Sequence, residues 1–570
     1  MENLKESQRA RVAIREFKTI TDSLAIRGFY RPSGRFGKAL EGCLRELSPE
    51  IYGTMNDAKV VELKGLEYVI DRLPQGVEKG TKIILTDEDE FEDTPFKRIE
   101  PLKRRRVSYQ ISDHEFCFIV SRGISEIYDI ITHMTFLNIE AKKIYLKMHD
   151  DYGNIRIEWE RLEKVVDRIA DLTMGELDSA LWNLSIILGR PYHETRETYE
   201  YLEKNRIESH SNTGLFSLIY HLGKRIENER VARENALVIY FAPSLMGIIG
   251  HQKYGKIWAG KIKDRLAELG LKDRPLHIVS ANLHSVVNVL YGYGALAQKN
   301  PAMDDSDIYE FFNSIKNETQ TIQAFAAERG LVQLPDESGS NTHCQLIDTA
   351  MRVDMPYHPG MKLKSTLSGK QMPVILVMDY AFGAQAFELM EQLLKPGEDS
   401  SGNWPLNLAS ISIMGKAGTL TGEKGDIMLA TAHVLEGTSD NYLFANDLTA
   451  EDFDADITVH RGTMATVLGT SLQNKDVLGM FQSDWNAVGL EMEGGHYHKA
   501  INASVIKGNI LPGVPVRYAY YASDNPLMTG NTLAAGAMGM EGIRPTYMIT
   551  MVILKKIMGD SLILDPPQIL

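Results

Sequence analysis

The sequence is poor in cysteine and in long apolar runs. Only three cysteines, Cys43, Cys117 and Cys344, occur in 570 residues, and they lie far apart. Because structural zinc sites and disulfide frameworks need closely spaced pairs, this spacing argues against both and favours a reducing compartment. No stretch approaches about eighteen consecutive apolar residues, and the N-terminus lacks the apolar segment of a signal peptide. The sequence therefore predicts a cytoplasmic protein without a membrane span.

The chain also lacks an excess of positive charge. Its formal net charge is −14 and its isoelectric point is about 5.6. This balance argues against nucleic-acid or membrane partners, although a small basic pocket is compatible with it. His496 and His498 form an isolated His-x-His pair without evident third and fourth ligands, so we expect no metal and no cofactor.

What the chain does have is the composition of an ordinary globular protein, with 44% hydrophobic and 24% charged residues. Its length exceeds what one hydrophobic core organises, which predicts more than one domain. Residues 1–335 repeat apolar side chains at intervals of three and four, the spacing of amphipathic helices. We expect a mostly helical domain of unassigned role there, with long helices at 124–147, 159–188, 215–249, 276–298 and 305–329.

The pattern changes at 334–343, a run of turn-forming residues, and we expect a linker and lead-in at 336–372. Beyond it, short apolar runs alternate with helical segments. Buried strands that alternate with helices are typical of an α/β sheet covered on both faces. The sequence therefore predicts a three-layer α/β/α domain at 373–570. Its expected elements are 373–379, 383–394, 408–414, 426–434, 457–461, 488–492, 496–503, 516–522 and 534–557.

Four motifs lie at expected strand ends, where open α/β sheets bind ligands. In the first, MGKAGTLTGEKGDIML at 414–429, Gly415 and Gly418 let backbone amides approach an anion or a sugar. The second, HRGTMAT at 460–466, places small hydroxyl residues after a strand. The other two, at 488–500 and 520–532, carry carboxylates.

The carboxylates of these last two motifs are candidates for the chemistry. On an extended strand Glu491 and Glu493 point the same way, and such a pair needs a polyhydroxyl, a cation or a proton nearby. Asp524 follows an apolar strand at a turn, where a carboxyl can protonate a leaving group. Taken singly, a solvated Glu-x-Glu pair and an Asp-initiated turn are the more common explanations.

Taken together and in order, the stretches GKAGTLTGEKGDIMLATAHVLEG, RGTMAT, GLEMEGG and YASDNPLMTG resemble the nucleoside phosphorylase and nucleosidase superfamily. The resemblance is strongest to the catalytic domain of AMP nucleosidase. It covers about the last third of the chain, 373–557, and leaves 1–335 unassigned. It implies a nucleoside phosphorylase-like α/β/α fold and self-association into a homo-oligomer.

The resemblance implies cleavage of the N-glycosidic bond of a purine nucleotide or nucleoside. Glu493 would hold the ribose hydroxyls, Met492 would pack on the sugar, and Asp524 would protonate the departing purine. A structural role is the alternative for Glu491. The substrate-binding set that the resemblance implies is Met492, Glu491, Gly415, Lys416, Gly418, Ser523 and Asn525.

The sequence departs from the superfamily pattern at the nucleophile. Phosphorylases of this superfamily have an arginine two residues before the first-loop glycine, whereas this chain has Ile413, and Lys416 follows the glycine. An apolar side chain cannot bind a phosphate dianion, so water is favoured as the nucleophile. Asn525 stands where a lysine or histidine often follows the aspartate. Three hypotheses remain open: an AMP nucleosidase-like hydrolase, a phosphate-dependent phosphorylase, and a non-catalytic nucleotide sensor with a partner-binding helical domain.

Overall fold

The computed structural model describes residues 5–88, 91–233, 236–247, 253–296, 307–352, 355–361, 371–400, 402–528 and 539–559. The chain folds into two compact units. Unit 1 contains Met1–His251 and Gly469–Val477, and unit 2 contains Gln252–Leu468 and Leu478–Leu570. No helix in the described ranges is long and apolar enough to cross a membrane.

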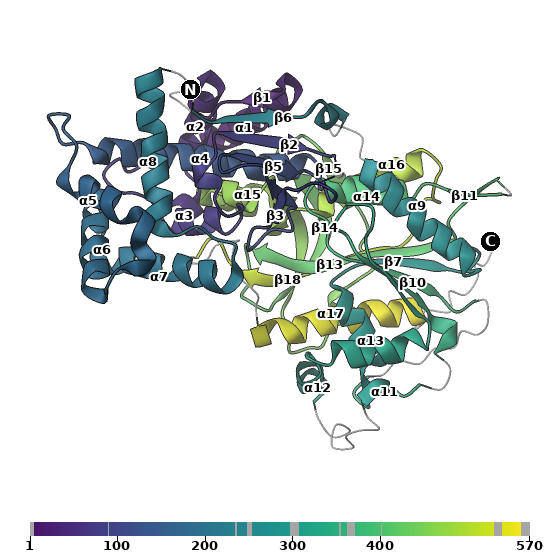
Figure 1. Cartoon of the computed structure of the whole chain (residues 1–570). Helices are drawn as coiled ribbons and strands as arrows, with labels where there is room; N and C mark the ends of the chain where they lie inside the picture. Colours follow the sequence, from purple (N-terminus) through teal and green to yellow (C-terminus); the bar gives the residue numbers. More distant parts are fainter. Residues whose placement is uncertain are drawn as a thin grey trace. The chain divides into compact units, whose positions relative to one another are not determined.

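Unit 1 combines eight α-helices among its described residues with a small mixed sheet (Figure 1). The helices are α1 (Glu6–Arg27), α2 (Arg35–Leu47), α3 (Leu63–Ile70), α4 (Ile124–Met148), α5 (Ile157–Val165), α6 (Met174–Leu188), α7 (Tyr192–Ser209) and α8 (Leu215–Ala232). The sheet has the order β1 (Phe29–Tyr30), β6 (Val238–Phe241), β2 (Lys82–Thr86), β5 (Glu115–Ile119), β4 (Ser108–Gln110) and β3 (Lys97–Ile99). Most of α4 is buried, and it packs against α2 and α8.

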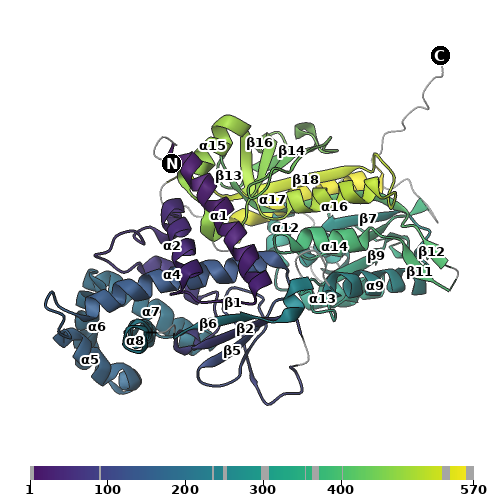
Figure 2. The same cartoon turned by 90° about the horizontal axis from the view of Figure 1, so that it is seen from above.

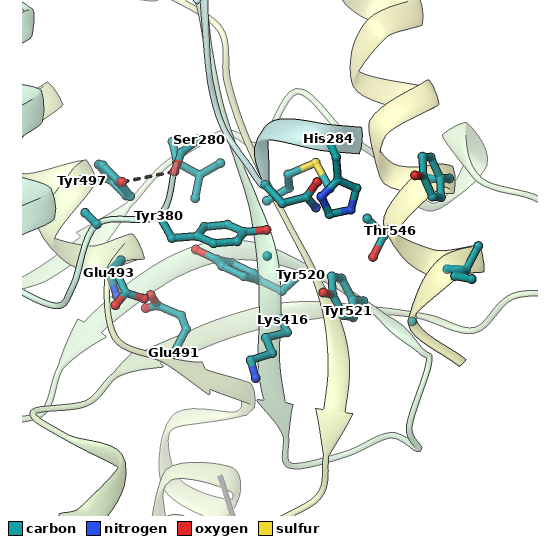
Figure 3. A pocket seen from close by; sticks show the side chains of 18 residues that line it. Ser280, His284, Tyr380, Lys416, Glu491, Glu493, Tyr497, Tyr520, Tyr521 and Thr546 are labelled. Atoms are coloured by element: carbon teal, nitrogen blue, oxygen red, sulfur yellow. Dashed lines mark hydrogen bonds between the residues drawn. The ribbon is translucent and has the colours of Figure 1, made fainter. Parts of the chain in front are cut away.

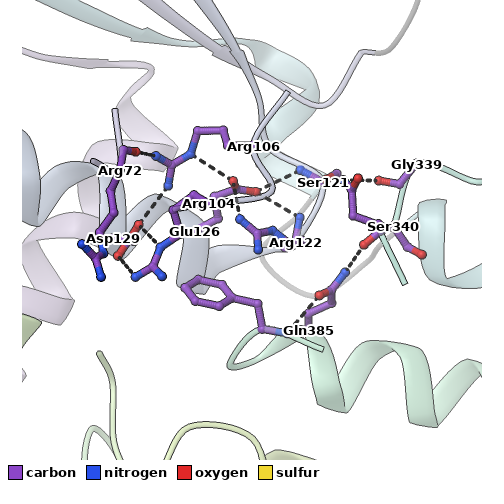
Figure 4. A network of polar contacts seen from close by, with 12 residues as sticks. Arg72, Arg104, Arg106, Ser121, Arg122, Glu126, Asp129, Gly339, Ser340 and Gln385 are labelled. Atoms are coloured by element: carbon purple, nitrogen blue, oxygen red, sulfur yellow. Dashed lines mark hydrogen bonds and ion pairs between the residues drawn. The ribbon is translucent and has the colours of Figure 1, made fainter. Parts of the chain in front are cut away.

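A buried polar network joins the loop before β4 to α4 (Figure 4). The Arg106 guanidinium is fully buried and donates to Glu126 Oε1 at 3.1 Å, to Asp129 Oδ2 at 2.9 Å and to the Arg72 carbonyl at 2.7 Å. Burial raises the pKa of Asp129, but the charges of Arg104, His133 and Arg106 lower it by more. The pKa of Asp129 therefore lies well below its usual range. Because buried charges need partners, this network fixes the loop against the helix.

A short segment from late in the sequence belongs to unit 1. The side chain of Asn474 donates to the Leu47 carbonyl at 2.8 Å, and the backbone N–H of Lys475 donates to Glu50 Oε1 at 3.1 Å. The hydroxyls of Tyr68 and Thr470 lie 3.1 Å apart. Unit 1 is therefore assembled from two separate stretches of chain.

Unit 2 is built on a ten-stranded sheet. Its path runs β15 (Asn441–Leu443), β14 (Ile427–Leu435), β16 (Val459–Thr466), β17 (Ala487–Glu491), β13 (Leu408–Thr419), β7 (Leu276–Ser280), β10 (Val374–Met378), β9 (Cys344–Asp348) and β8 (Leu331–Leu334). β18 (Val516–Asp524) pairs parallel with β13 and antiparallel with β14. A separate hairpin joins β11 (Gly397–Asp399) to β12 (Gly402–Trp404).

Helices cover both faces of this sheet. Along β10, Val374, Leu376 and Met378 pack into one core cluster, and Ile375 and Val377 pack into the other, as strand alternation requires. The first cluster includes α9 (Lys253–Glu268), α14 (Gln385–Leu393) and α16 (Gly494–Ile506). The second includes α10 (Leu283–Val287), α11 (Tyr293–Leu296), α12 (Ile308–Ser314), α13 (Thr319–Ala327) and α17 (Ile543–Met558). Figure 2 shows α17 lying along β18, which it contacts. The remaining helix, α15 (Lys475–Trp485), precedes β17.

The strands expected beyond 373 are confirmed, since each overlaps β10, β13, β14, β16, β17 or β18. The alternation with helices holds only in part, because no α-helix lies between β13 and β16, a stretch that is described throughout. The expected helix at 534–557 begins at Ile543 instead, and 534–538 lie outside the described residues.

Before residue 373 the structure differs from the expectation. The continuous helices expected at 215–249 and 276–298 are wrong, because each range contains a strand, β6 and β7 respectively. Among its described residues, unit 1 also holds six strands of two to five residues, which are too short to show alternation. The chain enters unit 2 at Gln252, whereas the sequence placed a helical domain at 1–335 and a linker at 336–372. The physical reason is that β7 and β9 pair on either side of β10 and so fold with the sheet.

Candidate active site

A cavity of about 620 Å³ lies at the carboxyl ends of parallel strands in unit 2 (Figure 3). Ser280 ends β7 and lies level with Met378 of β10 and Ile413 of β13. β13 and its parallel neighbour β18 continue beyond this level and form a wall. The loop after β10, the turn after β17 and the starts of α10, α16 and α17 complete the described lining. The volume is in the range of small-molecule sites, about 300–1,000 Å³.

Glu491 ends β17 and lines the cavity, yet it is only 7% exposed. Its Oε2 accepts the backbone N–H of Glu493 at 2.5 Å and that of Gly494, and its Oε1 accepts the Thr466 hydroxyl at 2.5 Å. Burial raises the pKa of Glu491, and the hydrogen bonds from Gly494, Thr466 and Glu493 lower it. These bonds occupy both oxygens, so the carboxylate holds the start of α16 in place.

Glu493 occupies the N-cap position of α16 and also lines the cavity. Its Oε1 accepts the backbone N–H of Gly383 at 2.9 Å, which draws the loop after β10 toward the turn after β17. Figure 3 shows the two carboxylates, Glu491 and Glu493, side by side at one end of the cavity. Glu493 is half-buried, so its carboxylate is the more accessible of the two.

Asp524 ends β18 and is 4% exposed. Its Oδ1 accepts the Ser523 hydroxyl at 2.5 Å, and its Oδ2 has no hydrogen-bond partner within the described residues. Burial raises the pKa of this carboxyl, whereas the Ser523 hydroxyl, Lys416 and Lys424 lower it. A bulge puts Asp524 opposite Gly418, on the strand face that also carries Lys416. Asp524 thus lies close to a residue of the cavity wall.

The structure places the other expected residues in two groups. Gly415 and Lys416 line the cavity with the two glutamates, and a Cβ at Gly415 would come within 3.3 Å of the Tyr380 ring. Five others are not among the described lining residues: Gly418, Met492, Ser523, Asp524 and Asn525. Of these, Ser523 donates to the Ala417 carbonyl at 3.2 Å, and Asn525 donates to the Gly422 carbonyl at 3.2 Å. They fix the loop that follows β18, part of which, at 529–532, lies outside the described residues.

None of the aromatic or neutral polar residues of the described lining was predicted from the sequence. The tyrosines of the lining are Tyr380, Tyr497, Tyr520, Tyr521 and Tyr547. His284, near the start of α10, lines the cavity in Figure 3, and burial lowers its pKa while Asp379 raises it. The sequence signal that could have indicated a helix start here is Asn282, because asparagine is a preferred N-cap residue. Its side chain caps α10 by accepting from Ser285 N at 2.8 Å.

The chain is similar to a family model described as "Family of unknown function (DUF6909)", which matches residues 38–304 and 307–559. No curated protein matches the sequence. Among solved structures, the 5′-methylthioadenosine/S-adenosyl homocysteine nucleosidase of Campylobacter jejuni is 12% identical, with a TM-score of 0.30, over 51% of this chain and 100% of that chain.

Two further solved structures give similar figures. The futalosine hydrolase of Helicobacter pylori is 13% identical, with a TM-score of 0.30, over 51% of this chain and 99% of that chain. The uridine phosphorylase of Schistosoma mansoni is 12% identical, with a TM-score of 0.29, over 50% of this chain and 87% of that chain.

Proposed function

The chain belongs to the family described as "Family of unknown function (DUF6909)", and on the geometry of its cavity we propose that it hydrolyses the N-glycosidic bond of a purine nucleoside or nucleotide, in the manner of an AMP nucleosidase. The observation that carries the proposal is a pair of carboxyl groups in different settings. Glu493 is accessible on the cavity wall, whereas Asp524 is buried beside Lys416 and has a raised pKa. Glycosidic cleavage needs groups that differ in this way, because one binds the sugar and the other delivers a proton.

Each group has a defined task in the proposed reaction. Glu493 accepts hydrogen bonds from the sugar hydroxyls, and its own bond to Gly383 N holds it in position. Asp524 gives its proton to the purine nitrogen as that nitrogen takes the electron pair of the breaking bond. The raised pKa of Asp524 increases the fraction of protein that holds this proton near neutral pH.

The attacking water needs a base, and His284 is suited to that task. The lowered pKa of His284 keeps its imidazole neutral at pH 7 and able to accept a proton. As the water oxygen bonds to the anomeric carbon, its proton passes to His284, and the products are the free base and the free sugar. Solvent then returns a proton to Asp524 and removes one from His284.

Phosphorolysis is the second candidate, favoured by one observation. Lys416 lines the cavity beside Gly415 and carries the positive charge that a phosphate nucleophile requires. Ile413 lines the same wall and offers no hydrogen bond.

One assay tests the proposal and separates the two candidates. The full-length protein is incubated with purine and pyrimidine nucleosides and their 5′-phosphates, with and without inorganic phosphate, and the released base and sugar are identified. Release of purine base and free sugar without phosphate supports hydrolysis. Release that depends on phosphate and yields a sugar 1-phosphate supports phosphorolysis instead. Absence of base release from every substrate refutes both.

A further inference from the structure

Tyr520 is a cavity residue that can donate a hydrogen bond to a ligand, whereas an ionised carboxylate can only accept one. It lies on β18, is 3% exposed and lines the cavity. Its hydroxyl has no hydrogen-bond partner within the described residues. Buried hydroxyls are nearly always paired with protein, water or ligand, so an unpaired one on a cavity wall is a position at which a ligand hydroxyl can bind.

The other cavity tyrosines differ from Tyr520 in this respect. Tyr497 pairs with the Ser280 hydroxyl at 3.1 Å, and Tyr547 accepts from Asn288 at 2.8 Å. Tyr380 is hydrogen-bonded by Asn282, and Tyr521 by Thr546. The unpaired phenol is therefore a particular feature of Tyr520, which Figure 3 places beside Tyr380 and near the two glutamates.

The surroundings of Tyr520 keep its phenol protonated. Burial raises its pKa well above the usual value, and Glu491 and Glu493 raise it further. A phenol in this state donates one hydrogen bond. Gly494 leaves room for it, since a Cβ at that position would collide with the Tyr520 hydroxyl and with the His433 ring. The site thus presents one donor next to one accessible acceptor, the carboxylate of Glu493.

We propose that Tyr520 donates its phenolic hydrogen to a sugar hydroxyl that in turn donates to Glu493, which makes this pair the determinant of sugar specificity. The proposal rests on the proposed function, because it assumes a nucleoside in the cavity. A hydroxyl is both a donor and an acceptor, so it satisfies the two side chains at once. A deoxy sugar that lacks this hydroxyl leaves the Tyr520 phenol unpaired and makes one hydrogen bond fewer to Glu493, so it is rejected.

The experiment compares the full-length wild-type protein with Tyr520→Phe on adenosine, 2′-deoxyadenosine and 3′-deoxyadenosine. We expect the wild type to prefer adenosine over at least one of the deoxy analogues. In Tyr520→Phe, kcat/KM for adenosine falls by about 10- to 100-fold, the range for loss of one buried hydrogen bond, while the same deoxy analogue loses much less. The preference for adenosine therefore shrinks by a similar factor.

Tyr518→Phe is the matched control. It makes the same substitution on the same strand, at a buried phenol that pairs with His498 Nδ1 at 3.2 Å and is absent from the described lining. This control should lower the melting temperature without changing the sugar preference, whereas Tyr520→Phe removes an unpaired hydroxyl and should not lower it. An unchanged sugar preference in folded Tyr520→Phe overturns the proposal.

Failure of the proposed function gives a different result. If the wild type releases no base, calorimetry with the same three nucleosides measures their binding directly. A Tyr520-dependent difference in Kd then supports the sugar contact without hydrolysis. Equal binding of all three nucleosides, or no binding, overturns the Tyr520 proposal as well.

Discussion

Replacement of Asp524 by asparagine tests the proposed proton donor most directly. The amide keeps the shape of the carboxyl and can still accept the Ser523 hydroxyl bond, which spans 2.5 Å in the structure, but it has no proton to give. General acid catalysis contributes about 10²- to 10⁴-fold, so kcat on a purine nucleoside should fall by that factor, which corresponds to about 3–5 kcal/mol. KM should change little, because the amide keeps the shape of the carboxyl and only the proton transfer is lost.

The same substitution should stabilise the protein above the pKa of Asp524. A carboxyl whose folded-state pKa is raised contributes stability at low pH and loses it as the pH rises through that pKa. Each unit of elevation corresponds to about 1.4 kcal/mol, and an asparagine does not incur this loss. Thermal unfolding should therefore show that the melting temperature of the variant, relative to that of the wild type, is higher at pH 7.5 than at pH 4.5.

The decisive comparison uses a substrate whose leaving group needs no proton. On 4-nitrophenyl riboside the Asp524→Asn variant should keep most of its rate, whereas on a purine nucleoside it should not. Asp426→Asn is the control, a nearby carboxyl that pairs with His460 at 2.9 Å. Equal losses on both substrates, or no loss on either, would refute the assignment of Asp524 as the acid.

Three further substitutions test other parts of the structure. Glu493→Gln should lower kcat/KM by at least about 100-fold with little change in melting temperature, because it weakens the acceptor for the sugar hydroxyls; a variant that keeps its activity would remove Glu493 from the site. The wild type should lose rate as the pH falls below 6.5 and through the lowered pKa of His284. His284→Asn should abolish this pH dependence, and an unchanged pH profile would contradict the role of His284 as base. Arg106→Met should cost about 3–5 kcal/mol in urea unfolding, because Glu126 and Asp129 lose a buried partner; a loss below 1 kcal/mol would show that the remaining arginines compensate.

The sequence identified part of the candidate site, and the reason is local. Gly415, Lys416, Glu491 and Glu493 lie at or next to strands whose apolar runs are easy to recognise, and all four line the cavity. The position of Asp524 relative to the wall depends on a bulge opposite Gly418, which no spacing rule predicts.

The rest of the lining could not be predicted, because it depends on long-range pairing. Ser280 and His284 come from a segment that the apolar periodicity assigned to a helical domain, since β7 is a five-residue strand between helices. Only its pairing with β10 and β13 brings it to the site. Tyrosine is also common in hydrophobic cores, so a sequence position alone does not distinguish a tyrosine that lines a cavity from one that packs in a core.

The return of Gly469–Val477 to unit 1 has a consequence for how this protein is inherited. A gene fragment that encodes residues 1–251 omits the partners of Leu47, Glu50 and Tyr68, so it does not encode all of unit 1. Recombination that exchanged this half alone would separate Leu47, Glu50 and Tyr68 from their hydrogen-bond partners in Gly469–Val477. The two units are therefore expected to pass through evolution as one indivisible gene, with a family model that extends across both.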